Sequence, residues 1–184
     1  CNITFKEKGP TLADLIQTNA VNENGYRYEG ADPNNYIQMQ KTDGTTEMWR
    51  IIGLFSDGEN GEDVIRVRGG YVESAYDTSG KNHWPKSSLY TSFKNVYSTS
   101  NYKNTVNYKV YLGGTGNDSS SYTTNDYYNM ERLLNNKGSV GSSAKSYYNS
   151  ETVSVVNVGL IYPSDYGYGV LASDCARETG LYMY

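Results

Sequence analysis

The 184-residue sequence predicts a single α+β domain, with a mixed or antiparallel twisted sheet, two or three short helices and long polar loops. Three observations support this prediction. Apolar runs of strand type are separated by Gly- and Asn-rich turns, two segments show helical spacing of apolar residues, and the length suits one domain of ordinary size. No internal repeat is visible, so residues 1–184 are expected to form one unit.

The N-terminal third predicts a short helix followed by a β-meander. Residues 10–17 contain Thr11, which can cap a helix, and Asp14 completes a capping-box pattern three positions later. Two turn signals, NG and DP, come next. Strands are then expected at 35–40, 46–55 and 64–68, joined by the turn KTDG and the loop SDGENGED.

The strand at 46–55, TEMWRIIGLF, is apolar on both faces, which predicts a central place in the sheet with cover on both sides. Strict alternation divides its apolar side chains between the two faces. One face is expected to carry Trp49, Ile51 and Phe55, and the other Met48, Ile52 and Leu54.

The second half of the chain predicts two further helices and two strands. A helix at 87–98 would be capped by Ser87, with an apolar stripe that includes Leu89 and Phe93. A helix at 125–135 would be capped by Thr124. Strands are expected at 106–112 and at 152–162, the latter with Val156, Val158 and Leu160 on its inner face.

Composition and charge narrow the classes of function. The chain has 16 Lys and Arg against 20 Asp and Glu, and no basic cluster, so no nucleic-acid partner is expected. No apolar run is long enough to span a bilayer. Tyrosine is enriched, with 20 Tyr against 3 Phe and 2 Trp. This is typical of binding loops, and equally of an extracellular β-rich domain that uses Tyr as half-buried strand filler.

The stretch 157–170, NVGLIYPSDYGYGV, predicts a core strand that ends in a turn made possible by glycine. Two interpretations of its polar side chains stay open. In the first, Asp165, Tyr166 and Tyr168 bind a ligand by hydrogen bonding and stacking, with Trp84 as a neighbour. In the second, the tyrosines pack the turn against the sheet.

Catalytic residues, metal ligands and cofactors are not predicted. The one histidine, His83, lies in GKNHWPKSS and is interpreted as a loop anchor rather than a member of a catalytic triad. Histidine and cysteine are too few for a transition-metal site. Oxygen ligands at 30–35 and 56–63 would allow loop calcium, but the 56–63 run departs from the EF-hand pattern, so a solvated hairpin loop is favoured.

Two cysteines, Cys1 and Cys175, lie near opposite ends of the chain. A disulfide between them would close a loop of nearly the whole chain and stabilise it by about 4–5 kcal/mol in the chain-entropy model. Other roles stay open for Cys1: a terminus produced by cutting the chain, a lipid-bearing mature terminus, or half of an intermolecular link.

Four segments together resemble a family of uncharacterised surface proteins of gut Gram-positive bacteria: YRYEGADPNNYIQM, MWRIIGLF, YDTSGKNHWPKSSLYTSF and NVGLIYPSDYGYGV. In that family the domain often follows a prepilin-like segment and resembles the C-type-lectin-like fold of the formylglycine-generating proteins. The resemblance implies that Trp49 and Trp84 are framework residues. Family members continue with a closing strand that this chain lacks after Tyr184, and the catalytic cysteines of the enzymes lie in that region. The resemblance therefore gives no reason to expect an enzymatic activity. It implies one of three explanations for the missing strand: the chain is truncated, the sheet is closed in a different way, or another chain supplies the strand.

Two functions follow from these observations. The first is a non-enzymatic recognition or adhesion module on a bacterial surface, which binds a glycan or a protein. The second is a structural subunit of a pilus or surface fibre, in which neighbouring subunits are the partners. Both place the protein outside the cell or at its surface.

Overall fold

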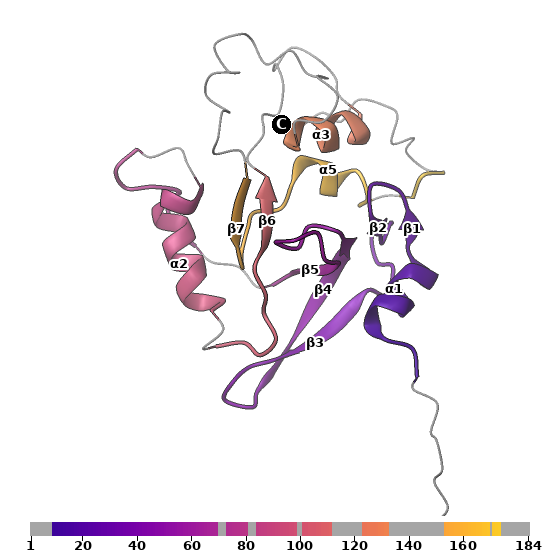
Figure 1. Cartoon of the computed structure of the whole chain (residues 1–184), viewed down its shortest axis with the longest axis horizontal. Helices are drawn as coiled ribbons and strands as arrows, with labels where there is room; N and C mark the ends of the chain where they lie inside the picture. The colour runs from indigo at the N-terminus through magenta and orange to yellow at the C-terminus, as the bar shows by residue number, and fades with distance from the viewer. Residues whose placement is uncertain are drawn as a thin grey trace, which may run out of the picture.

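The computed structural model describes residues 9–69, 73–80, 84–98, 101–111, 123–132, 153–169 and 171–173. These residues form a five-stranded sheet, a two-stranded ribbon and several short helices, and every strand pair is antiparallel (Figure 1). The predicted α+β class is thereby confirmed. The elements of the sheet half are α1 (Leu12–Asn19), β1 (Val21–Asn22), β2 (Tyr26–Arg27), β3 (Tyr36–Gln40), β4 (Thr46–Phe55) and β5 (Val64–Arg68). The remaining elements are η1 (Trp84–Lys86), α2 (Ser88–Val96), β6 (Tyr108–Tyr111), α3 (Thr124–Glu131), β7 (Val153–Val156) and α5 (Pro163–Tyr166).

Strand β4 is the centre of the sheet, as its sequence predicts. Strands β2 and β3 follow one another along one edge of β4, and β5 pairs with its other edge. The consecutive strands β3, β4 and β5 form the expected meander. Met48 on β4 is 62% exposed, however, so the first half of this strand is covered on one side only.

A β-bulge interrupts β4 and changes which side chains share a face. The register passes from Ile51 opposite Val67 to Gly53 opposite Arg66, which leaves Ile52 as the extra residue. Because one added residue inverts the alternation, Leu54 joins Ile51 and the fully buried Ile16 of α1 in a core cluster. The prediction that Phe55 shares a face with Ile51 is wrong for this reason.

Helix α1 covers that face of the sheet, and its start is the predicted capping box. The Asp14 N–H donates to Thr11 Oγ1 at 3.2 Å, and the Thr11 N–H donates to Asp14 Oδ2 at 2.8 Å. The helix ends at Asn19, and the chain turns at once into the β1–β2 hairpin.

Gly53 lies at a crowded point between β2 and the ring of Phe55. A Cβ at this position would overlap the carbonyl oxygen of Tyr26 and lie 3.1 Å from two ring carbons of Phe55. We expect Gly53→Ala to lower the free energy of unfolding by about 1–3 kcal/mol, because the backbone of β2 must shift. Denaturant unfolding measures this change. Gly9→Ala is the matched control, since open space surrounds that position; equal losses in both variants would contradict the crowding argument.

A second packing unit joins η1 and α2 to the β6–β7 ribbon. Trp84 is buried with Val110 of β6 and Val156 of β7, and the rings of Tyr90 and Phe93 on α2 meet it edge-on. The predicted cap of this helix is confirmed, because the Tyr90 N–H donates to Ser87 Oγ at 3.0 Å.

Two predicted boundaries differ in the structure. The strand expected at 152–162 ends at Val156, because Val156 is opposite Tyr108, the first residue of β6, and no strand of the described residues pairs with those beyond it. Leu160 is accordingly 41% exposed instead of pointing inward. The helix expected from 125 begins at Thr124, and Thr123 is its cap through a capping box with Asp126.

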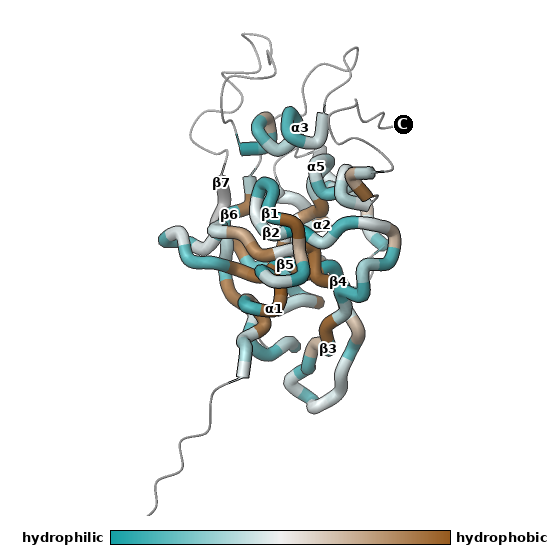
Figure 2. Tube along the Cα trace, turned by 90° about the vertical axis from the view of Figure 1, so that its right-hand side faces the viewer, coloured by the Kyte–Doolittle hydropathy of each residue, from teal (hydrophilic) through white to brown (hydrophobic). Residues whose placement is uncertain are grey.

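Helix α3 packs against the short helix α5 at one end of the molecule (Figure 1). Its sequence is polar, as its mainly hydrophilic colouring in Figure 2 shows, yet Asn129 and Glu131 are buried. Such a helix needs polar partners within the protein. None of the described helices is long and apolar enough to cross a membrane. His83, Cys1 and Cys175 lie outside the described residues.

Candidate functional site

The four residues predicted to bind a ligand do not form one exposed group. Trp84 is 3% exposed, lies in the α2 packing unit and donates its indole N–H to the carbonyl oxygen of Val158 at 3.1 Å. Tyr168 is buried and donates its hydroxyl to the carbonyl oxygen of Glu23 at 3.1 Å. Tyr166 is exposed. The burial of Tyr168 agrees with the second interpretation of 157–170, in which the tyrosines pack the turn against the sheet.

Asp165 is buried between two arginines that come from the sheet. Its Oδ1 lies 2.5 Å from Arg27 Nη1 and its Oδ2 lies 2.9 Å from Arg66 Nη2. The Tyr162 N–H also donates to Oδ2 at 2.9 Å. Burial disfavours the ionised carboxylate, but the charges of Arg66 and Arg27 outweigh it and hold the pKa of Asp165 below its usual value. Asp165 thus anchors α5 to the sheet as a carboxylate.

The sheet brings these arginines together through cross-strand pairing. Arg27 on β2 is opposite Gly53 on β4, and Gly53 is opposite Arg66 on β5. Residues directly opposite each other project from the same face of a sheet, so the two guanidinium groups lie on either side of the bare glycine. Aromatic rings flank both cations, with Phe55 within 5 Å of each.

A second buried ion network surrounds Arg132, at the end of α3. Its Nη2 lies 3.0 Å from Asp57 Oδ2, and its guanidinium stacks on the ring of Tyr128. Glu131 accepts hydrogen bonds from both the backbone N–H and the hydroxyl of Ser164 on α5. Burial raises the pKa of Glu131 to about 6, against the opposing effect of these hydrogen bonds. These are the polar partners that the sequence of α3 requires.

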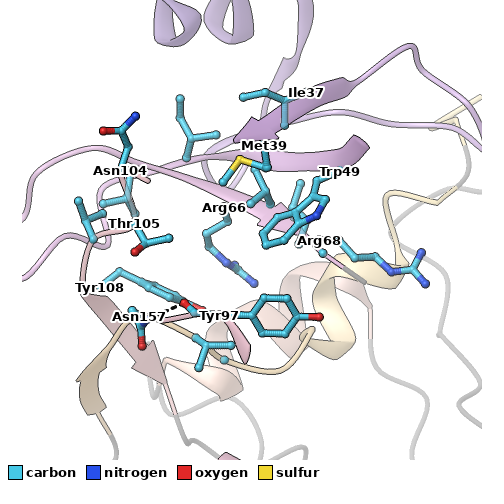
Figure 3. Close-up of a pocket in the computed structure, with 18 of the residues that line it drawn as sticks. Ile37, Met39, Trp49, Arg66, Arg68, Tyr97, Asn104, Thr105, Tyr108 and Asn157 are labelled. Atoms are coloured by element: carbon cyan, nitrogen blue, oxygen red, sulfur yellow. Dashed lines mark hydrogen bonds between the residues drawn. The ribbon is translucent and has the colours of Figure 1, made fainter. Parts of the chain in front are cut away.

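The principal cavity is a groove of about 560 Å³ beside β5 (Figure 3). Strands β3 and β5 form one wall, and the segments 103–106 and 157–161 form the other. Its lining is mainly apolar and aromatic, and it includes three of the exposed large hydrophobic residues of the chain. These three are Val106, Leu160 and Ile161.

Strand β5 gives the groove its distinctive feature. Within the described chain β5 pairs with β4 alone, so its second edge has no strand partner there. Every residue from 64 to 69 lines the groove, and alternate residues of a strand point to opposite faces. The groove therefore runs beside the unpaired edge itself, where backbone N–H and C=O groups are presented.

The charged side chains in the described lining of the groove are all cationic. Its described lining contains three cationic side chains, Arg66, Arg68 and Lys103, and no Asp or Glu, although the whole chain has a net charge of −4. Arg66 Nη1 and Thr105 Oγ1 are buried and find no hydrogen-bond partner among the described residues. Two orphaned polar atoms beside an apolar groove are typical of a site that a ligand completes.

The groove is not predicted from the sequence, although one signal was present. The alternation in VIRVR places Arg66 and Arg68 on the same face of β5, and the buried Arg66 requires a partner. The ion-pair partner of Arg66 is Asp165, which lies far along the chain, so no local sequence pattern identifies it.

The loop considered for calcium uses its oxygens internally. Asp57 pairs with Arg132, Ser56 Oγ donates to Asp63 Oδ1 at 2.6 Å, and Glu62 accepts from the backbone and side chain of Asn60. No group of three or more His, Cys, Asp or Glu side chains suited to a metal ion is found among the described residues.

No family model matches the chain, and no curated protein or solved structure is significantly similar to it. The site's own geometry must therefore carry the functional argument.

Proposed function

We propose that this protein is a non-enzymatic recognition module of a bacterial surface, and that it captures an extended polypeptide segment in the groove beside β5. The edge of β5 that has no strand partner among the described residues is the observation that carries this proposal, because an added strand would satisfy its backbone groups. The apolar walls would hold the side chains of such a segment on alternate sides.

Of the two ligand classes expected from the sequence, the groove favours a polypeptide over a glycan. Several aromatic side chains of its lining pack on one another: Tyr97 meets both Trp49 and Phe93 at nearly right angles, and Trp49 is buried. These rings are engaged within the protein, which disfavours stacking on a sugar. The described lining has no Asp, Glu, His or Cys side chain, which supports binding rather than catalysis. The resemblance noted in the sequence supports an extracellular or cell-surface location and, as part of this proposal, a C-type-lectin-like variant of the α+β fold.

The test is selection from a random peptide library on the purified protein, followed by affinity measurements with groove variants. Val106 is 60% exposed and lines the groove, so Val106→Trp should fill it at little cost to folding. We expect selected peptides to bind this variant about tenfold more weakly or worse. Methylation of alternate peptide nitrogens should weaken binding likewise, because it removes strand hydrogen bonds.

Met48→Trp is the matched control, since Met48 is equally exposed on β4 but does not line the groove. It should leave affinity unchanged. Failure to select any peptide, or equal losses in both variants, would overturn strand capture in this groove.

The second candidate is a structural subunit of a pilus or surface fibre, and the same edge of β5 supports it. In that case the added strand comes from a neighbouring copy. Light scattering across a concentration series tests this second candidate: mass that grows with concentration supports a fibre subunit, whereas a constant monomer mass counts against self-assembly by this chain.

A further inference from the structure

A second cavity, of about 160 Å³, adjoins the groove and is lined mainly by residues of β2, β4, the 28–35 segment and the 161–169 segment. The two cavities share Ile52, Arg68 and Ile161 as lining residues. The charged residues that line the smaller cavity are Arg27, Arg50, Arg68 and Asp165. Three cations and one anion give this small cavity a net positive lining.

The carboxylate of Asp165 cannot balance all three cations. Its Oδ1 is engaged by Arg27, and its Oδ2 is engaged by Arg66, which does not line the cavity. Oδ2 also accepts a hydrogen bond from the backbone. The neutral polar side chains of the cavity are Tyr28, Asn35 and Tyr168, and Asn35 is already engaged. Its Oδ1 accepts from Arg50 Nε at 3.2 Å, and its amide donates to the carbonyl oxygen of Ile51.

Two guanidinium groups of the cavity retain unused donors. Arg27 is 1% exposed, and its Nη2 has no hydrogen-bond partner among the described residues. A buried N–H of a charged group is costly to leave unpaired. Arg68 is exposed, and within the described chain no hydrogen bond or ion pair holds its guanidinium. Figure 3 shows Arg68 extending away from the groove.

Strand register adds a further reason for an anion here. Arg50 on β4 is directly opposite Arg68 on β5. Like charges in such a cross-strand pair repel each other. Among the described residues, the acidic group paired with Arg50 is the exposed Asp32, at 3.9 Å. An oxyanion between the strands would relieve this repulsion and accept hydrogen bonds from Arg68 and Arg27 together.

We propose that this cavity, between Arg27, Arg50 and Arg68, binds a carboxylate group, and that it belongs to the polypeptide held in the neighbouring groove. The carboxylate is either an Asp or Glu side chain of that segment or its C-terminus. This inference rests on the proposed function for the identity of the ligand, but the anion site itself stands on the arginine geometry. A guanidinium fork matches the two oxygens of a carboxylate.

The first experiment uses acetate and inorganic sulfate as probes, at constant ionic strength, and follows backbone amide resonances of the purified protein by NMR. Acetate should shift the resonances of Gly30 and Gly169, which line the cavity, along saturable curves. Arg68→Gln should weaken acetate binding about tenfold or more, because a charge-assisted hydrogen bond is lost. Lys94→Gln, which removes the same charge from an exposed position on α2, should leave the affinity unchanged.

Three outcomes would overturn the carboxylate site: shifts that do not saturate, equal weakening in both variants, or saturable binding of sulfate without acetate. The second experiment distinguishes the sources of the carboxylate. Selected peptides are compared as C-terminal acids and amides, and with internal acidic residues changed to their amides. The change that weakens binding to the wild type, but not to Arg68→Gln, identifies the group that enters the cavity.

The anion site and the proposed function can fail separately. Acetate binding that depends on Arg68, in a protein that selects no peptides, would overturn the groove proposal and leave the anion site standing. If the protein captures peptides, Val106→Trp abolishes this capture and acetate does not bind, the groove proposal stands and the anion site is overturned.

Discussion

Asp165→Asn is expected to lower the free energy of unfolding by about 3–5 kcal/mol, which is a large part of the stability of an ordinary domain. The substitution keeps the size of the side chain but removes the charge that Arg27 and Arg66 share. Both guanidinium groups are buried, so neither can recover its hydration without opening the structure. Denaturant unfolding followed by circular dichroism measures the loss.

The control for this prediction is Asp32→Asn. Asp32 also lies near an arginine, at 3.9 Å from Arg50, but its side chain is 73% exposed. Solvent screens such a pair, so the expected change is below about 1 kcal/mol. Similar losses in the two variants would show that Asp165 does not hold the buried arginines as the structure describes.

The same prediction has a pH dependence. The pKa of Asp165 is lowered in the folded protein, so its stabilising effect is complete above the unfolded-state pKa of about 4 and is lost as the pH falls through the folded value. The difference in stability between the wild type and Asp165→Asn should therefore shrink as the pH falls below about 4. A difference that grows toward acid would contradict the direction of the shift.

Trp84→Ala is expected to lower the free energy of unfolding by about 3–5 kcal/mol, an effect as large as that of Asp165→Asn. The ring fills the space between α2 and the β6–β7 ribbon, where it contacts Tyr90, Phe93 and Val110. Removing it leaves a cavity and an unpaired carbonyl at Val158. Thermal and denaturant unfolding measure the loss.

Trp84→Phe separates packing from hydrogen bonding at this position. It retains most of the ring but lacks the indole N–H, so we expect a smaller loss of about 1–3 kcal/mol from the unpaired carbonyl. Peptide affinity should remain at the wild-type value, because Trp84 does not line the groove. A variant that folds with full stability but loses ligand binding would instead restore Trp84 to the ligand site.

The predicted caps and strands show which features local sequence can specify. The helix starts at Thr11 and Ser87 were predicted correctly because a capping side chain bonds to a backbone group only three residues away. The strands at 46–55 and 64–68 were predicted with their observed bounds, since turn residues on both sides delimit their apolar runs. These signals act within a few residues, so the sequence displays them directly.

The face assignment of β4 and the group at 157–170 show where local patterns fail. The bulge at Ile52 follows from how β5 aligns with β4, and it moved Leu54 to the face where Phe55 was expected. The same tyrosine- and aspartate-rich pattern would suit an exposed loop or a packed turn. Only the placement of α5 against the arginines of the sheet decides that Asp165 and Tyr168 lie inside while Tyr166 remains exposed.

The sequence by itself thus determined the α+β class, the central strand, the meander and the caps at Thr11 and Ser87, because each arises from the spacing of neighbouring residues. The tertiary structure alone decided that Arg27 and Arg66, 138 and 99 positions from Asp165, converge on that one carboxylate. It also decided that the edge of β5 borders a groove and that Arg50 is opposite Arg68. Contacts over such separations depend on which strands pair and in what register, and strand pairing is settled by the packing of the whole chain.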